Sequence, residues 1–132
     1  MDRDSRLLQV ALWVYLIDSL AFGVVIFFVP EFTVETLGDA PGFDYWWVRW
    51  AGGLLLALAL GAALVIRKPR GQGPMVTVFA TAVLLVGVAL LWSWLAGEYD
   101  GAAWFLVLTL AATFPVSALL WYAFTQNREV LA

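Results

Sequence analysis

The sequence predicts an all-α integral membrane protein, a single bundle of four transmembrane helices with both termini in the cytoplasm. Of its 132 residues, 64% are apolar and only 13% are charged, about half the charged share of a soluble domain. The apolar residues gather in four stretches, each long enough to supply the roughly 20 residues that cross a bilayer. These stretches do not alternate polar with apolar residues, so we expect helices rather than barrel strands. They leave no room for a second domain within residues 1–132.

The four predicted spans cover residues 7–29, 46–66, 75–96 and 102–124. Pro30 follows the first span at once and favours a helix end or the first turn of a new helix there. A short interfacial helix is expected over residues 31–37, because Glu31 suits the positive end of a helix dipole and Gly38 favours a helix end. The third and fourth spans contain no charged residue, and the first two contain one each.

Basic residues are confined almost entirely to one side of the predicted bundle. Six of the seven lie in the N-terminal tail, the second connection and the C-terminal tail: Arg3, Arg6, Arg67, Lys68, Arg70 and Arg128. The first and third connections carry acidic residues instead: Glu31, Glu35, Asp39, Asp44, Glu98 and Asp100. Because Lys and Arg favour the cytoplasmic side of a membrane, we expect a multi-pass protein of the inner cell membrane with its tails inside.

Two stripes of residues are predicted to pack the helices together. Small residues recur at every fourth position of the second span: Gly53, Ala57 and Gly61. Such a stripe allows close approach of a neighbouring helix, in the same bundle or from another copy. Hydroxyl side chains recur in the same way in the fourth span: Thr109, Thr113 and Ser117. We expect these hydroxyls to face the bundle interior, where they donate interhelical hydrogen bonds or line a polar cavity.

Tryptophan is abundant and unevenly placed along the chain. Six of the eight lie at or near the predicted outer interface: Trp46, Trp47, Trp50, Trp92, Trp94 and Trp104. An aromatic belt explains part of this pattern, because indole rings favour the head-group level of a bilayer. The excess on one side also fits an aromatic-walled pocket that opens to the outer leaflet, and the sequence leaves both interpretations open.

Two charged side chains fall inside the predicted spans. Asp18 lies at the centre of the first, where a carboxylate costs about 2.5–3.5 kcal/mol on insertion scales and is a functional candidate by default. Arg49 lies near the outer end of the second and is its natural partner, although Arg49 can also reach outward to Asp44, Glu31 or lipid head groups. Tyr15, one turn before Asp18, is placed to donate a hydrogen bond to it. Asp18 is then either a paired structural residue or a proton-binding site.

Several chemistries are excluded by composition. The sequence contains no Cys and no His, which excludes disulfides, zinc sites built on those ligands and His- or Cys-ligated haem. It contains no phosphate-binding loop and no basic patch of the kind that binds nucleic acid. We therefore predict no catalytic residue, no metal site and no nucleic-acid partner, lean against an enzyme, and assign no cofactor.

Short motifs in the first half of the chain resemble a known family. They are Gly23, the run Phe28-Val29-Pro30, the pair Leu37-Gly38, the run Arg49-Trp50-Ala51-Gly52, and Gly61. This pattern is similar to the DoxX-like group of small bacterial four-helix membrane proteins. The resemblance implies a compact four-helix bundle with Arg49 at a recurring position, and it implies no particular activity.

The leading functional hypothesis is a non-enzymatic membrane protein that binds an apolar ligand, lipid or membrane partner through its aromatic outer half. One alternative is a proton-coupled transporter of small molecules that uses Asp18. Another is an accessory subunit of a larger membrane complex. The expected partners are accordingly membrane lipid, an apolar small molecule, and either further copies of this chain or other membrane subunits.

Overall fold

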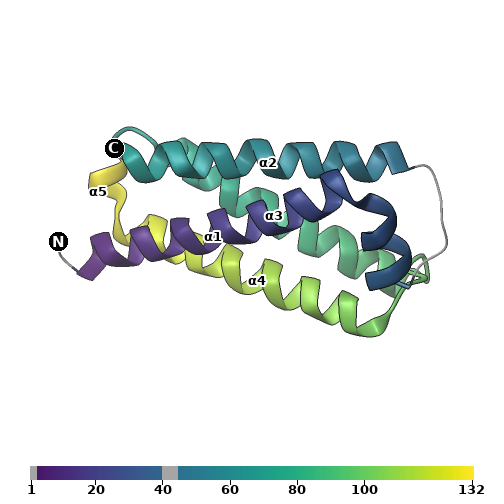
Figure 1. Ribbon diagram of the computed structural model, residues 1–132. Coiled ribbons are helices and arrows are strands. Elements are labelled where there is room, and N and C mark those ends of the chain that lie inside the picture. The colour runs from purple at the N-terminus through teal and green to yellow at the C-terminus, as the bar shows by residue number, and fades with distance from the viewer. Residues whose placement is uncertain (1–2, 40–44) are drawn as a thin grey trace.

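The computed structural model describes residues 3–39 and 45–132, and these residues form helices without any strand (Figure 1). The four long helices are α1 (Arg3–Phe28), α2 (Tyr45–Arg67), α3 (Gly73–Leu95) and α4 (Ala103–Gln126). A short π-helix, η1 (Phe32–Leu37), follows α1, and the single-turn helix α5 (Arg128–Leu131) follows α4. The predicted all-α four-helix bundle is confirmed.

Each of the four long helices is long and apolar enough to cross a membrane, with 23 to 26 residues apiece. The chain is therefore a multi-pass membrane protein. α1 begins and α5 ends at the same end of the bundle (Figure 1). We call this the terminal end, and we call the opposite end, which carries η1 and the α3–α4 connection, the loop end. That the terminal end faces the cytoplasm stays a prediction from the charge pattern.

α1 and α2 approach each other closely near the loop end because Gly52 has no side chain. A Cβ at Gly52 would lie 2.6 Å from the backbone nitrogen of Phe27 and 2.9 Å from its Cα. Gly23 makes similar room on the other helix, since a Cβ there would lie 3.0 Å from Cδ2 of Leu56. Two glycines on facing helices thus allow backbone contact that larger residues would prevent, as is common between transmembrane helices.

The predicted small-residue stripe of α2 does not face a single neighbour. A Cβ at Gly53 would lie 3.6 Å from the ring of Phe27 on α1, whereas one at Gly61 would lie 3.3 Å from the ring of Phe79 on α3. Ala57, between them, is exposed. The stripe therefore serves α1 at the loop end and α3 toward the terminal end. From the contact at Gly61 onward, α2 and α3 diverge toward the loop end (Figure 1).

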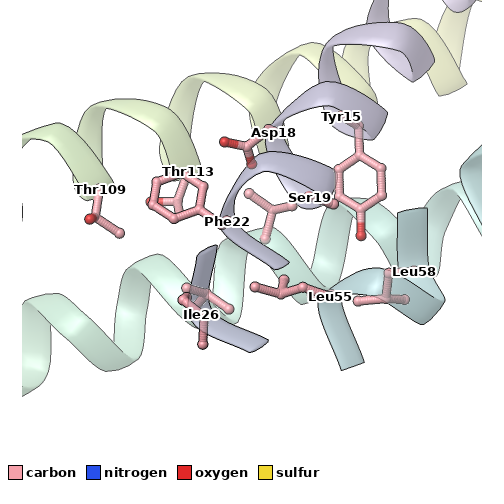
Figure 2. Close-up of a pocket in the computed structure, with 12 residues that line it drawn as sticks. Tyr15, Asp18, Ser19, Phe22, Ile26, Leu55, Leu58, Thr109 and Thr113 are labelled. Carbon is pink, nitrogen blue, oxygen red and sulfur yellow. The ribbon is translucent and has the colours of Figure 1, made fainter. Parts of the chain in front are cut away.

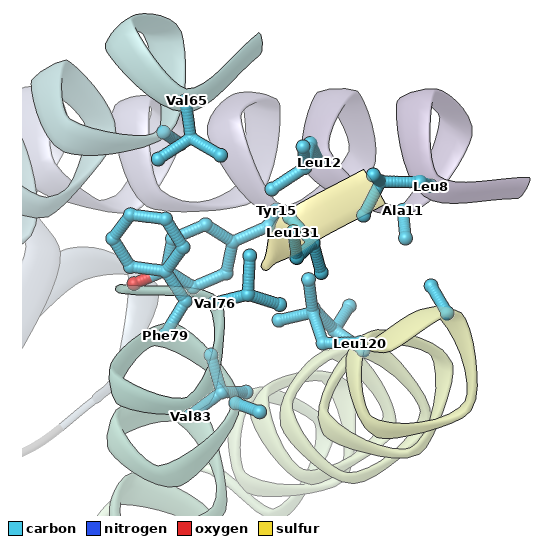
Figure 3. Packing of buried hydrophobic residues seen from close by; sticks show 14 residues of the cluster. Leu8, Ala11, Leu12, Tyr15, Val65, Val76, Phe79, Val83, Leu120 and Leu131 are labelled. Carbon is cyan, nitrogen blue, oxygen red and sulfur yellow. The ribbon is translucent and has the colours of Figure 1, made fainter. Parts of the chain in front are cut away.

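The buried hydrophobic core fills the half of the bundle nearer the terminal end (Figure 3). Its members are Leu8, Ala11, Leu12, Tyr15, Ala62, Val65, Val76, Phe79, Ala80, Val83, Val116, Leu120, Ala123 and Leu131. Within the core the rings of Tyr15 and Phe79 stack, with centroids 4.9 Å apart and an interplanar angle of 24°. This stacked pair joins α1 to α3.

Buried polar side chains join the helices around this core. Ser117 Oγ donates a hydrogen bond to the carbonyl of Ala80, 2.9 Å away, which links α4 to α3. Asn127 Nδ2 donates to the carbonyl of Asp4 at 2.7 Å and to that of Ala123 at 2.9 Å. The C-terminal segment is thereby attached to the first turn of α1.

The segment after α1 is helical, as predicted, but its turns are wider than those of an α-helix. The backbone nitrogen of Gly38 donates to the carbonyl of Thr33, five residues earlier, at 2.9 Å. Thr33 Oγ1 in turn lies 2.9 Å from the carbonyl of Val29 and 3.2 Å from that of Val25 and donates to both, which fixes η1 against the last turn of α1. The backbone nitrogen of Ala102 donates to the carbonyl of Gly38, so the two loop-end connections are joined.

Candidate functional site

A cavity of about 120 Å³ lies among the four long helices, next to the core on its loop-end side (Figure 2). All four helices contribute to its wall, which is mostly apolar. The polar side chains in the wall come from α1 and α4: Tyr15, Asp18, Ser19, Thr109 and Thr113. A mostly apolar cavity with a few convergent polar groups is the usual form of a small-molecule site.

The structure brings together Asp18 and three of the four residues that the sequence predicted for the polar interior of the bundle. Tyr15, Asp18, Thr109 and Thr113 all line the cavity. The fourth, Ser117, is buried one turn further toward the terminal end, where it makes the interhelical hydrogen bond to α3. The sequence left two roles open for the hydroxyl stripe. Thr109 and Thr113 line a cavity, whereas Ser117 donates an interhelical hydrogen bond.

Asp18 lies near the middle of α1, and its side chain is half-buried at the edge of the cavity. Its carboxyl group points toward α4, on the side of Thr113 (Figure 2). Among the described residues it has no hydrogen-bond or ion-pair partner. A charged group at this depth is expensive, and the fold supplies nothing that compensates for it. Helix packing therefore does not account for this carboxyl group.

The Tyr15 hydroxyl is a second polar group that the fold leaves unsatisfied. Tyr15 is 1% exposed, and its oxygen has no hydrogen-bond partner in the described part of the chain. The expected hydrogen bond from Tyr15 to Asp18 is thus not formed. Figure 2 shows why: the hydroxyl points toward Leu58 of α2, whereas the Asp18 carboxyl points toward α4. Stacking on Phe79 explains the burial of the ring, and Ser19 lies close enough to interact with the hydroxyl. No hydrogen bond of ordinary geometry forms, and an unsatisfied buried hydroxyl costs about 1–3 kcal/mol.

The two threonines of α4 present oxygen atoms whose hydrogens are already engaged. Thr109 Oγ1 donates to the carbonyl of Phe105 at 2.8 Å, and Thr113 Oγ1 donates to that of Leu110 at 3.3 Å. A hydroxyl that donates to its own helix still has lone pairs that accept. The wall beside Asp18 is therefore rich in acceptors.

Arg49 does not pair with Asp18. Its Nη1 donates to the backbone carbonyl of Phe27 at 2.9 Å, nine residues beyond Asp18 and thus roughly 13 Å further along α1 at 1.5 Å per residue. The last carbonyls of a helix have no partner within it and favour a nearby cation. Arg49 thus caps the C-terminal end of α1. Of the outward partners considered for it, Asp44 lies outside the described residues.

We expect Arg49→Gln to lower the free energy of unfolding by about 0.5–1 kcal/mol, because it removes a cation from the negative end of the α1 dipole. Arg70→Gln is the matched control, because it removes the same charge from a residue that is exposed in the α2–α3 connection. The measurement is unfolding by titration with sodium dodecyl sulfate, followed by tryptophan fluorescence. Equal losses in the two variants would argue against the capping role.

The outer tryptophans face away from the bundle. The side chains of Trp46, Trp47, Trp50, Trp92, Trp94 and Trp104 are all more than half exposed, with fractions of 52% to 71%. None of them lines the central cavity. Trp46 and Trp50 border a shallow surface groove with Arg49, and Trp46 stacks on Trp47 with ring centroids 4.2 Å apart. This outward orientation favours the aromatic belt over the aromatic-walled pocket.

Sequence reasoning did not identify the apolar wall of the cavity or Ser19. The apolar wall residues are Phe22, Ile26, Leu55, Leu58, Ala82, Val83 and Val86. Nothing in a membrane span distinguishes a leucine that faces a cavity from one that faces lipid, so no sequence signal was available for these residues. Ser19 did carry a signal, because a second polar residue directly after Asp18 is unusual at the centre of a span.

Comparisons with known proteins add no assignment. Neither a family model, nor a curated protein, nor a solved structure matches the chain. The DoxX-like resemblance therefore stays a prediction. Within residues 3–39 and 45–132, no group of three or more His, Cys, Asp or Glu side chains is placed to hold a metal ion.

Proposed function

We propose that this membrane protein binds a small, mostly apolar molecule in the cavity beside Asp18. The observation that carries the proposal is the combination of an apolar cavity with two polar groups, the Asp18 carboxyl and the Tyr15 hydroxyl, that have no partner among the described residues. Unsatisfied polar groups in an apolar interior are destabilising. Their presence in one cavity is explained if a ligand satisfies them.

The size of the cavity limits the ligand. A cavity of about 120 Å³ is somewhat smaller than the engineered cavity of about 150 Å³ that binds benzene. A phospholipid is therefore far too large for it, and a molecule of about one aromatic ring is the appropriate scale. This proposal differs from binding through the aromatic outer half, because the outer tryptophans face away from the cavity.

Filling the cavity tests the proposal. In Ala82→Phe a ring would extend from the α3 wall into the cavity, whereas Ala118→Phe, on an exposed face of α4, adds the same ring outside it. Native mass spectrometry of the protein released from lipid nanodiscs should detect a bound small molecule, natural or added, in the wild type and in Ala118→Phe but not in Ala82→Phe. Equal occupancy of all three proteins would contradict the proposal.

Proton-coupled transport of a small molecule is the second candidate, and the unpaired carboxyl group of Asp18 near the middle of a membrane span favours it. Intramembrane acids that face a cavity commonly carry protons along a substrate path. The two candidates share one site and differ in whether the ligand crosses the membrane. Uptake of a ligand into proteoliposomes driven by a proton gradient would support transport, and binding without uptake would support a receptor or carrier role.

A further inference from the structure

We propose that the ligand of the central cavity is a small organic cation, a protonated primary amine on an apolar body of about one ring, with Asp18 as its counter-ion. This inference depends on the proposed function, because it names the chemical class that the same cavity selects. Three features of the cavity carry it: the hydrogen-bonding character of the wall near Asp18, the absence of a competing cation, and the division of the wall into a polar and an apolar part.

The wall near Asp18 offers acceptors. Thr109 Oγ1 and Thr113 Oγ1 have given their hydrogens to carbonyls of α4, so they contribute acceptor lone pairs to the wall that they share with Asp18. An ammonium group has three donors and no acceptor, and it therefore matches a carboxylate flanked by acceptor oxygens. A carbonyl ligand would need donors beside Asp18, and neither threonine has a free one, while the hydroxyl of Tyr15 points away from Asp18 toward Leu58 (Figure 2).

No basic side chain in the described part of the chain competes for Asp18. Arg49 is engaged with the Phe27 carbonyl at the loop end. The remaining basic residues lie at the terminal end: Arg3, Arg6, Arg67, Lys68, Arg70 and Arg128. Tyr15 is the only other titratable side chain in the cavity wall, where α2 and α3 contribute only apolar residues. A charged carboxylate at this depth calls for a compensating charge, which a cationic ligand would bring.

The cavity also has an apolar side that suits the body of such a molecule. Leu55 and Leu58 of α2 lie across the cavity from the Asp18 carboxyl group (Figure 2), and Val86 of α3 belongs to the same wall. A ring that packs against these side chains leaves its ammonium substituent beside Asp18. The lipid head group phosphatidylethanolamine carries the same ammonium chemistry, but it resides at the interface, whereas Asp18 lies near the middle of α1.

The test compares ligands of equal size and different polarity. Benzylamine, benzyl alcohol and ethylbenzene are added to the protein in phosphatidylcholine nanodiscs near neutral pH, and binding is measured by calorimetry with empty discs as the reference. We expect wild type to bind benzylamine at least about tenfold more tightly than ethylbenzene, since a charge-assisted hydrogen bond contributes roughly a tenfold to hundredfold gain. Benzyl alcohol is expected between the two.

Variants connect the preference to the proposed residues. Asp18→Asn should reduce benzylamine affinity roughly tenfold or more and leave ethylbenzene affinity within about threefold. Thr113→Val removes one acceptor and keeps the shape of the side chain. It should reduce the affinity for benzylamine by a smaller factor than Asp18→Asn does, and it should leave the affinity for ethylbenzene unchanged. Asp100→Asn removes the same charge from the exposed α3–α4 connection and should change neither affinity.

The outcomes separate this inference from the proposed function. If benzylamine and ethylbenzene bind wild type equally and Asp18→Asn changes neither, the cavity is a binding site but the ammonium assignment is wrong. If none of the three ligands binds, both proposals fail. Nanodiscs that also contain phosphatidylethanolamine identify the source of the ammonium: loss of benzylamine binding would assign it to the lipid head group, and unchanged binding would assign it to a free amine.

Discussion

Replacing Gly52 with alanine is expected to destabilise the bundle by about 1–3 kcal/mol, the usual effect of overpacking, whereas the same change at Gly53 is expected to be neutral or stabilising. A Cβ at Gly52 would lie 2.6 Å from the backbone nitrogen of Phe27. Backbone atoms of two packed helices cannot move aside as a flexible side chain can. The added methyl group therefore forces α1 and α2 apart.

Gly53 is the matched control because it differs from Gly52 only in the direction it faces. Its nearest neighbours would be ring atoms of Phe27 at 3.6 and 3.7 Å, an ordinary packing distance. Alanine stabilises a helix by about 0.5–1 kcal/mol relative to glycine, so Gly53→Ala should retain or increase the stability of the protein. The measurement is the free energy of unfolding from detergent titration. Equal stability of the two variants would mean that the helices do not cross as closely as this contact requires.

The spans were predictable from the sequence because the bilayer imposes one length on all of them. The predicted span 46–66 agrees with α2 (Tyr45–Arg67) to within one residue at each end. The first helix begins at Arg3, four residues before the predicted span. Hydropathy identifies only the part of a helix that lies in hydrocarbon, and a helix can continue into the interface with polar residues such as Arg3 and Asp4.

Which side of each helix packs against its neighbours was much less predictable. A soluble helix reveals its buried side by an apolar stripe, but these spans are apolar on every side. Both Gly52 and Gly53 were visible in the sequence, and only the rotation of α2 about its axis decides that Gly52 meets the backbone of α1. The exposed position of Ala57 within the predicted stripe has the same origin.

The candidate site was predictable to the extent that it is polar. Asp18, Tyr15 and the threonines Thr109 and Thr113 are exceptions in apolar spans, and the structure brings all four to one cavity. The sequence could not predict that Asp18 and Arg49 do not pair, because Arg49 has a competing partner that side-chain patterns do not reveal. The free carbonyls at the end of α1 are such partners, and Arg49 takes that of Phe27.

Replacing Asp18 with leucine is expected to increase stability while abolishing ligand binding. The carboxyl group has no partner among the described residues, so its removal breaks no hydrogen bond or ion pair. Carboxylates at a helix centre cost about 2.5–3.5 kcal/mol on insertion scales, whereas leucine is favourable by about 0.5 kcal/mol. Part of this difference persists in the unfolded state, which leaves an expected gain of about 1–2 kcal/mol in the free energy of unfolding. Stability lost for the sake of function is common at binding sites.

Asp100→Leu, in the exposed α3–α4 connection, is the control and should change stability by less than about 0.5 kcal/mol, as surface substitutions usually do. A loss of stability in Asp18→Leu would contradict the proposed role, because only a residue with a structural partner is costly to remove. Arg49 would then be the first partner to test. The stability of the double variant Asp18→Asn with Arg49→Gln decides between these cases. If its change in the free energy of unfolding equals the sum of the two single changes, the residues act separately, and if it differs from that sum, they are coupled. Since Arg49 caps α1 roughly 13 Å away along the helix, we expect additivity.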